Sequence, residues 1–171
     1  EGNIIKIVVA NKKIEGNYQI QLEKVDKDNP ETKLQGAEFQ VTLPGKSPEI
    51  KTTETNGIVN LGTVDITEIT TKDTITVKET KAPNGYNKIL DTMTIEVEKQ
   101  LSGNTYTIKN ATIKSGKVEG TSVTIEGNII KIVVANKKIE GNYQIQLEKV
   151  DKDNPETKLQ GAEFQVTLPG K

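Results

Sequence analysis

This chain of 171 residues contains an exact internal repeat. Residues 1–46 recur, letter for letter, as residues 126–171, which gives a period of 125 residues. This period exceeds the roughly 20–50 residues of a solenoid repeat and lies within the usual size of a folded domain. The sequence therefore predicts a tandem array of domains, each with its own core. Because identical copies have not diverged to bind different ligands, the repeat favours a role in length and mechanical continuity over a role in catalysis.

The composition argues against several kinds of site and partner. The chain has 23 basic and 24 acidic residues, a net charge of −1, which gives no electrostatic reason to expect nucleic acid or an anionic membrane as a partner. Its most hydrophobic stretch, residues 4–10, is broken by Lys6, so we expect no membrane insertion by this segment. Histidine and cysteine are absent, which removes the usual zinc ligands and thiol chemistry. We expect no metal and no cofactor.

Short runs rich in threonine, isoleucine and valine predict strands along nearly the whole chain. The predicted strands are residues 18–25, 38–43, 58–61, 74–78, 92–98, 105–109, 123–125 and 129–135. Clusters of glycine, proline and asparagine between them, such as Asn56-Gly57, predict turns. Strands at this spacing, with no helical period, predict an all-β fold, an antiparallel β-sandwich.

The repeat and the strand pattern together predict the domain boundaries. Residues 17–137 are expected to form one complete domain. Residues 1–13 are then the last strand of a preceding repeat, and residues 142–171 are the opening strands of a following one. Because the chain begins without methionine or a signal peptide, we expect its targeting signals to lie outside this segment.

Three of the predicted strands carry a polar residue on their apolar face. Side chains two positions apart share a face of a strand. Lys24 is in phase with Ile20 and Leu22, Glu79 with Ile75 and Val77, and Asn136 with Ile130, Ile132 and Val134. The copy of the last strand repeats the pattern with Asn11 in phase with Ile5, Ile7 and Val9.

Two interpretations of these residues are open. In the first, each lies at a strand end, where the lysine amine reaches water and the asparagine begins a turn. In the second, Lys24, Glu79 and Asn136 meet in the core. Burial disfavours charge, so a neutral amine would sit beside a protonated carboxyl group. Such an amine is a nucleophile next to an amide carbonyl that the acid polarises.

Three ordered motifs surround these residues. They are LEKVD at residues 22–26 followed by LQGAEF at 34–39, ETKAPNGY at 79–86, and IVVANK at 132–137. Together they resemble the opening K-x-D and L-x-G-A-x-F motifs, the ETxAPxGY box and the closing strand of the Cna protein B-type (CnaB) domains of Gram-positive surface adhesins and pilins. The resemblance covers residues 17–137 and implies an immunoglobulin-like, prealbumin-like sandwich. One departure is a long, strand-rich insert at about residues 100–125, which leaves the number of strands open.

The resemblance also implies roles for the three residues. In that family a lysine and an asparagine condense spontaneously into an isopeptide bond with loss of ammonia, assisted by a glutamic acid. These roles fall on Lys24, Asn136 and Glu79. Asn11 and Lys149 hold the equivalent positions of neighbouring repeats, so within this chain only Lys24 and Asn136 are expected to be joined.

The resulting prediction is a structural stalk repeat of a bacterial cell-surface adhesin or pilus, extracellular and anchored to the cell surface or cell wall. Its expected partners are neighbouring identical repeats of the same polypeptide and, through other domains, a host surface. No enzyme activity is expected beyond the single-turnover, autocatalytic formation of the isopeptide bond. The alternative is a repeat that binds extracellular matrix or glycan, because sandwiches often carry ligand sites on their loops. Aromatic residues make up only 4% of the chain and tryptophan is absent, which argues against stacking on sugars.

Overall fold

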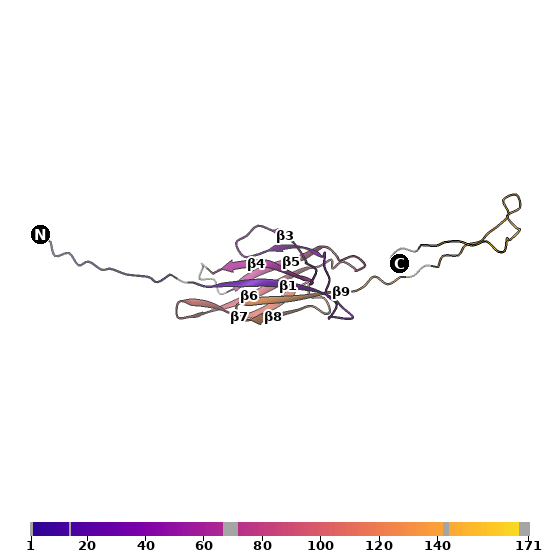
Figure 1. Ribbon diagram of the computed structural model, residues 1–171. Coiled ribbons are helices and arrows are strands. Elements are labelled where there is room, and N and C mark those ends of the chain that lie inside the picture. The colour runs from indigo at the N-terminus through magenta and orange to yellow at the C-terminus, as the bar shows by residue number, and fades with distance from the viewer. Residues whose placement is uncertain (1, 14, 67–71, 142–143, 168–171) are drawn as a thin grey trace. The chain divides into compact units, whose positions relative to one another are not determined.

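The computed structural model describes residues 2–13, 15–66, 72–141 and 144–167. The chain divides into two units, Glu1–Ile139 and Glu140–Lys171. All nine strands found among the described residues belong to the first unit, and they form two sheets (Figure 1). Among all the residues that the structure describes, no helix is long and apolar enough to span a membrane.

The first sheet joins the beginning of the domain to its end. It contains β1 (Asn17–Asp26), β4 (Ile58–Asp65), β8 (Ser122–Glu126) and β9 (Ile129–Asn136), in the order β4-β1-β9-β8. Strands β4 and β8 pair antiparallel with their neighbours, whereas β1 and β9 run parallel. In that parallel pair Lys24 lies opposite Val134 and Asp26 lies opposite Asn136. The first and last strands are therefore direct neighbours.

The second sheet is antiparallel throughout. It contains β2 (Glu38–Thr42), β3 (Glu49–Thr52), β5 (Lys72–Lys81), β6 (Thr92–Ser102) and β7 (Thr105–Ser115), in the order β3-β2-β5-β6-β7. The long insert of residues 100–125 supplies the end of β6, all of β7 and most of β8, and so extends both sheets.

The apolar core lies between the inner faces of the two sheets. Every second residue of the central strands is buried, as expected when one face of each sheet covers the other. The buried set includes Tyr18, Ile20 and Leu22 of β1, Ile75 and Val77 of β5, Ile95 and Val97 of β6, and Ile130, Ile132 and Val134 of β9. Burying each aliphatic side chain favours folding by about 1.5–3 kcal/mol. The predicted all-β sandwich is confirmed.

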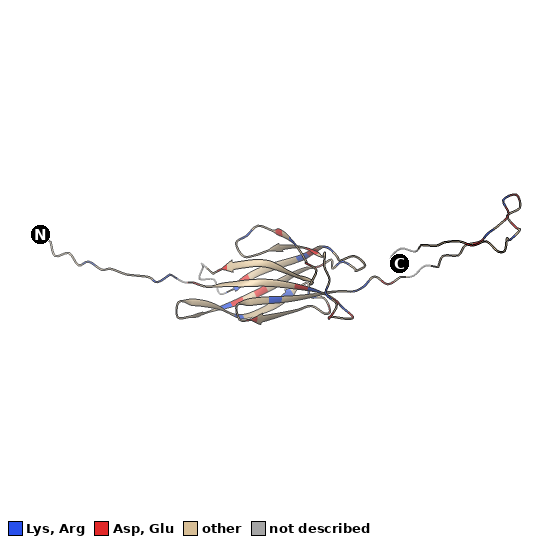
Figure 2. Cartoon of the chain, in the orientation of Figure 1, with Lys and Arg blue, Asp and Glu red and all other residues tan. Residues whose placement is uncertain are grey.

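The outer faces and loops carry charges of both signs. Lysine and acidic positions are interspersed along the strands rather than gathered by sign (Figure 2). On the second sheet, for example, Lys72 pairs with Glu96 and Glu98, and Lys114 pairs with Glu96. Exposed pairs of this kind contribute little to stability, because water and salt screen them.

Residues 2–13 and 144–167, the described parts of the chain before and after this domain, carry no strand. Residues 4–11 have the same sequence as β9, yet Ile4, Ile5, Ile7 and Val9 are exposed, whereas their counterparts in β9 are buried or partly buried. The difference lies in the neighbours, because β9 is flanked by β1 and β8. A single strand has no partner for its backbone hydrogen bonds, so the same sequence forms a strand only beside a sheet. Residues 14, 142–143 and 168–171 lie outside the described residues.

Candidate functional site

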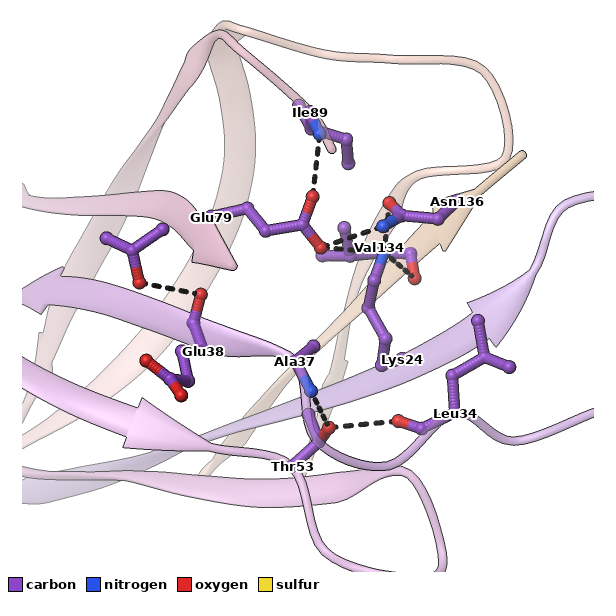
Figure 3. A network of polar contacts seen from close by, with 10 residues as sticks. Lys24, Leu34, Ala37, Glu38, Thr53, Glu79, Ile89, Val134 and Asn136 are labelled. Atoms are coloured by element: carbon purple, nitrogen blue, oxygen red, sulfur yellow. Dashed lines mark hydrogen bonds and ion pairs between the residues drawn. The ribbon is translucent and has the colours of Figure 1, made fainter. Parts of the chain in front are cut away.

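Three buried polar side chains meet between the two sheets. Lys24 extends from β1 and Asn136 from β9, both in the first sheet, while Glu79 extends from β5 in the second (Figure 3). Their exposed fractions are 0%, 1% and 2%, respectively. Lysine and glutamate are almost never buried to this extent unless they are paired. Of the two interpretations of these residues, the structure therefore favours the one in which they meet in the core.

Strand alternation and the parallel register bring the residues together. Lys24 and Asn136 both point inward, and they lie diagonally across the β1–β9 pair because Lys24 faces Val134, two residues before Asn136. Diagonal neighbours in a sheet are roughly 7–8 Å apart, a gap that the four methylene groups of lysine can span. A shorter amine side chain at position 24 would not reach.

The polar atoms form one continuous network. The Lys24 Nζ atom donates to Asn136 Oδ1 at 2.5 Å and to the Val134 carbonyl oxygen at 3.1 Å. Asn136 Nδ2 donates to Glu79 Oε1 at 2.9 Å, and the same oxygen lies 3.6 Å from Lys24 Nζ. The other Glu79 oxygen, Oε2, accepts from the backbone N–H of Ile89 at 2.6 Å.

The surroundings of Lys24 favour its neutral form. Burial lowers the pKa of the Lys24 amine from 10.5 to about 8, although the nearby Glu79 carboxylate opposes this shift. The amine also lies over the ring of Phe39, with 6.0 Å from Nζ to the ring centroid. A neutral amine, the nucleophilic form of lysine, is therefore accessible near pH 8.

This arrangement is suited to an attack by the amine on the carboxamide. The hydrogen bond to Oδ1 holds Nζ beside the carbonyl group of Asn136. Glu79 Oε1 contacts both the nitrogen that would lose a proton and the nitrogen that would leave. The sequence-based expectation that the acid polarises the carbonyl oxygen differs from this geometry. The carboxamide turns its nitrogen toward Glu79, because the Nζ donor already occupies its oxygen.

Two hydrogen-bonding groups of the network were not predicted from the sequence. They are the Val134 carbonyl and the Ile89 N–H, both from the backbone. Every residue except proline carries both groups, so no residue type marks them. The remaining predicted positions, Asn11 and Lys149, are exposed and take no part in the network.

The fold and this core define a prealbumin-like β-sandwich domain whose first and last strands share a buried polar site. The family model of the SpaA prealbumin-like fold domain matches residues 18–112, more than half of the chain. The chain belongs to this family.

Solved structures share the fold at low sequence identity. The C-terminal fragment of the pilus adhesin SpaC from Lactobacillus rhamnosus GG superposes with a TM-score of 0.51 and 21% identity, over 75% of this chain and 48% of the fragment. A second structure of that fragment gives a TM-score of 0.50 and 21% identity, over 75% of this chain and 47% of the fragment. The T6 backbone pilin of serotype M6 Streptococcus pyogenes aligns with a TM-score of 0.45 and 21% identity, over 72% of this chain and 35% of the pilin. This chain thus spans about half the length of the SpaC fragment. No curated protein matches it in sequence.

Proposed function

We propose that this chain is a structural stalk repeat of a bacterial cell-surface adhesin or pilus, closed by an isopeptide bond between Lys24 and Asn136. The observation that carries the proposal is the contact of a fully buried lysine amine with a buried carboxamide, 2.5 Å from Nζ to Oδ1, beside a buried carboxyl group. Membership of the SpaA family and the fold shared with a pilus adhesin fragment support the surface setting.

The bond forms in a balanced exchange of one amide for another. The neutral Lys24 Nζ attacks Asn136 Cγ, and the Nζ–Cγ bond forms as the Cγ–Nδ2 bond breaks. Glu79 Oε1, which lies 3.6 Å from Nζ and 2.9 Å from Nδ2, takes a proton from the amine and delivers it to the departing nitrogen. Ammonia leaves, and Glu79 ends in the protonation state in which it began. The Ile89 N–H and the Val134 carbonyl hold the acid and the amine in place.

The position of the bond gives it a mechanical role. It closes a loop between residues 112 apart, and in the chain-entropy model for cross-links this favours the folded state by roughly 4–5 kcal/mol. Tension that enters at the start of β1 reaches Lys24, crosses the bond and leaves through Asn136. The other strands are then bypassed. Neighbouring repeats of the same polypeptide are the proposed partners, and the cell surface or cell wall is the proposed location.

Peptide mapping tests the proposal at residue resolution. A digest of the folded chain is expected to contain one branched peptide in which the Lys24 segment is joined to the Asn136 segment. Lys149 and Asn11 lie in copies of the same sequence. The digest is therefore made on a chain that carries Lys149→Arg and Asn11→Gln, which give the peptides of these two positions different masses, and those peptides are expected to be linear. Recovery of Lys24 and Asn136 only in linear peptides would reject the proposal.

A further inference from the structure

A hydrogen bond outside the reacting group connects β1 to the loop that follows β5. Asp26 lies two residues beyond Lys24, and its Oδ2 atom accepts from the Tyr86 hydroxyl at 2.8 Å. Its Oδ1 atom accepts from the backbone N–H groups of Asp28 at 2.7 Å and Asn29 at 3.0 Å. Asp26 is buried and Tyr86 is half-buried. One carboxylate thus ties together a strand end, a turn and a loop.

The loop that Tyr86 anchors holds Glu79. Ile89 lies three residues after Tyr86, and its N–H donates to Glu79 Oε2 at 2.6 Å. The side chain of Glu79 therefore takes its orientation from this loop. The Tyr86–Asp26 hydrogen bond fixes the middle of this loop to the strand that carries Lys24.

The same structure also holds the backbone at Asn136. The turn that Asp26 caps includes Lys27, whose N–H donates to the Asn136 carbonyl at 3.0 Å. The loop after β5 is also hydrogen-bonded to the residues that follow Asn136. Asn87 N–H donates to the Lys137 carbonyl at 2.9 Å, and Ile139 N–H donates to the Gly85 carbonyl at 2.8 Å. The segments that the Asp26–Tyr86 hydrogen bond joins therefore hold both Glu79 and the backbone around Asn136 in position.

We propose that Asp26 and Tyr86 are positioning residues that set the rate of bond formation between Lys24 and Asn136. The inference rests on the proposed function. Neither side chain contacts the reacting atoms, so their effect is on geometry alone. A displacement of about 1 Å in a reacting group can slow a reaction by roughly a hundredfold. Loss of one anchoring hydrogen bond is expected to have a smaller effect, on the order of tenfold.

The chain offers a matched control for removing the Tyr86 hydroxyl. Tyr18, at the other end of β1, donates its hydroxyl to Asp73 Oδ2, also at 2.8 Å, and it is fully buried. Tyr18→Phe and Tyr86→Phe therefore delete the same kind of tyrosine–aspartate hydrogen bond from the same strand, far from the site in one case and beside it in the other. Tyr18→Phe is expected to cost at least as much stability, because Tyr18 is fully buried whereas Tyr86 is half-buried.

The experiment follows ammonia loss during cell-free synthesis of the full chain. Timed samples are treated with protease to remove unfolded chains, quenched in denaturant and weighed by mass spectrometry, so that the rate refers to folded molecules. We expect Tyr86→Phe to slow the reaction on the order of tenfold and Tyr18→Phe to leave it unchanged. Asp26→Asn, which keeps the side-chain size, is expected to slow it as well and carries the test if Tyr86→Phe does not fold. The amide resonance of Ile89 should shift in Tyr86→Phe and not in Tyr18→Phe.

The outcomes separate this inference from the proposed function. If the wild-type chain loses no ammonia, the proposed function fails and the inference fails with it. If the wild-type chain loses ammonia and both Tyr86→Phe and Asp26→Asn lose it at the wild-type rate, the inference alone is overturned. Equal slowing by Tyr18→Phe and Tyr86→Phe also overturns it, because the effect would then follow stability rather than position.

Discussion

Lys24 is among the largest side chains that the core buries completely, and it is charged in its ordinary state. Removing a lysine from water is costly, and a domain built only for stability would place an aliphatic residue there. The lysine gains a hydrogen bond to Asn136 and a carboxyl neighbour in Glu79. An amide bond would remove the charge altogether. The cost of burying the lysine is thus understandable if the residue reacts.

The pH dependence of the reaction follows from the state of this amine. Only the neutral amine attacks, and burial lowers the pKa of Lys24 to about 8. The neutral fraction therefore rises with pH up to about 8 and changes little above it. We expect the rate of ammonia loss to rise about tenfold per pH unit below this pKa and to level off above it. Newly synthesised chain, diluted into buffers of different pH and weighed at intervals, gives the rate. A rate that decreases as the pH approaches 8 from below would contradict this role.

Glu79 is expected to act through proton transfer as well as through packing. Glu79→Gln keeps the size of the side chain but removes the group that carries the proton. We expect it to slow ammonia loss by about 10²–10⁴-fold, the usual contribution of general acid–base catalysis. Glu38→Gln, a change at a partly exposed residue that pairs with Lys81, is the control and should react at the wild-type rate. A Glu79→Gln variant that reacts as fast as the wild type would leave Glu79 with no chemical role.

At the scale of the strands, alternation predicted both the inner face of the sheets and the three residues of the site. The sequence indicated eight of the nine strands that the structure describes, and most of them are longer than expected. β3 (Glu49–Thr52) was missed because it is a short edge strand with mostly exposed residues and so has no apolar alternation. The parallel β1–β9 pair was also missed. Pairing partners depend on the whole topology and not on either strand's own sequence.

Close contacts of the backbone were harder to predict than strands. Gly57 was expected in a turn, but its packing against Lys24 was not. The Lys24 N–H donates to the Gly57 carbonyl at 2.7 Å, and the Lys24 carbonyl accepts from Leu34 N–H at 2.9 Å. A side chain at Gly57 would place its Cβ 2.7 Å from the Lys24 carbonyl oxygen. The glycine thus lets a turn lie directly against the strand that carries the lysine.

This contact gives a prediction about two glycines. Gly57 and Gly85 have similar backbone angles, with φ of 73° and 84°, but a Cβ at Gly85 would meet nothing within 4 Å. Gly85→Ala is expected to cost about 1 kcal/mol of stability from its backbone angle alone. Gly57→Ala should cost a further 1–3 kcal/mol or so, because the backbone must move. Urea unfolding of both variants measures the change in the free energy of unfolding. Equal decreases for Gly57→Ala and Gly85→Ala would show that the close contact with Lys24 does not affect stability.

At the scale of the whole molecule, the repeated ends and the buried site both favour a role in bearing tension along a tandem array. Residues 4–11 and 144–151 have the sequences of β9 and of most of β1 but form no strand, so in the proposed tandem array each domain is expected to supply its own first and last strands. Those are the two strands that Lys24 and Asn136 connect. The proposed cross-link between these strands would make a tandem array covalently continuous under tension.

Pulling single molecules of an array of complete repeats tests this use. Wild-type repeats are expected to stay folded at forces that open an ordinary β-sandwich, because the load bypasses most of the domain. Glu79→Ala repeats should unfold one after another, each releasing roughly 400 Å of chain. Repeats that unfold at the same modest force with and without Glu79 would favour the alternative, a repeat that binds matrix or glycan.

The intact mass of the folded chain is the most direct test of the bond between Lys24 and Asn136. The wild-type chain is predicted to weigh one ammonia less than its sequence, whereas Lys24→Ala, Asn136→Ala and Glu79→Ala should each have the full mass of their sequences. Lys99→Ala removes another buried lysine, which pairs with Asp73 at 2.6 Å, and this control should still lose one ammonia. A fully folded wild-type chain with the unreduced mass of its sequence would contradict the account.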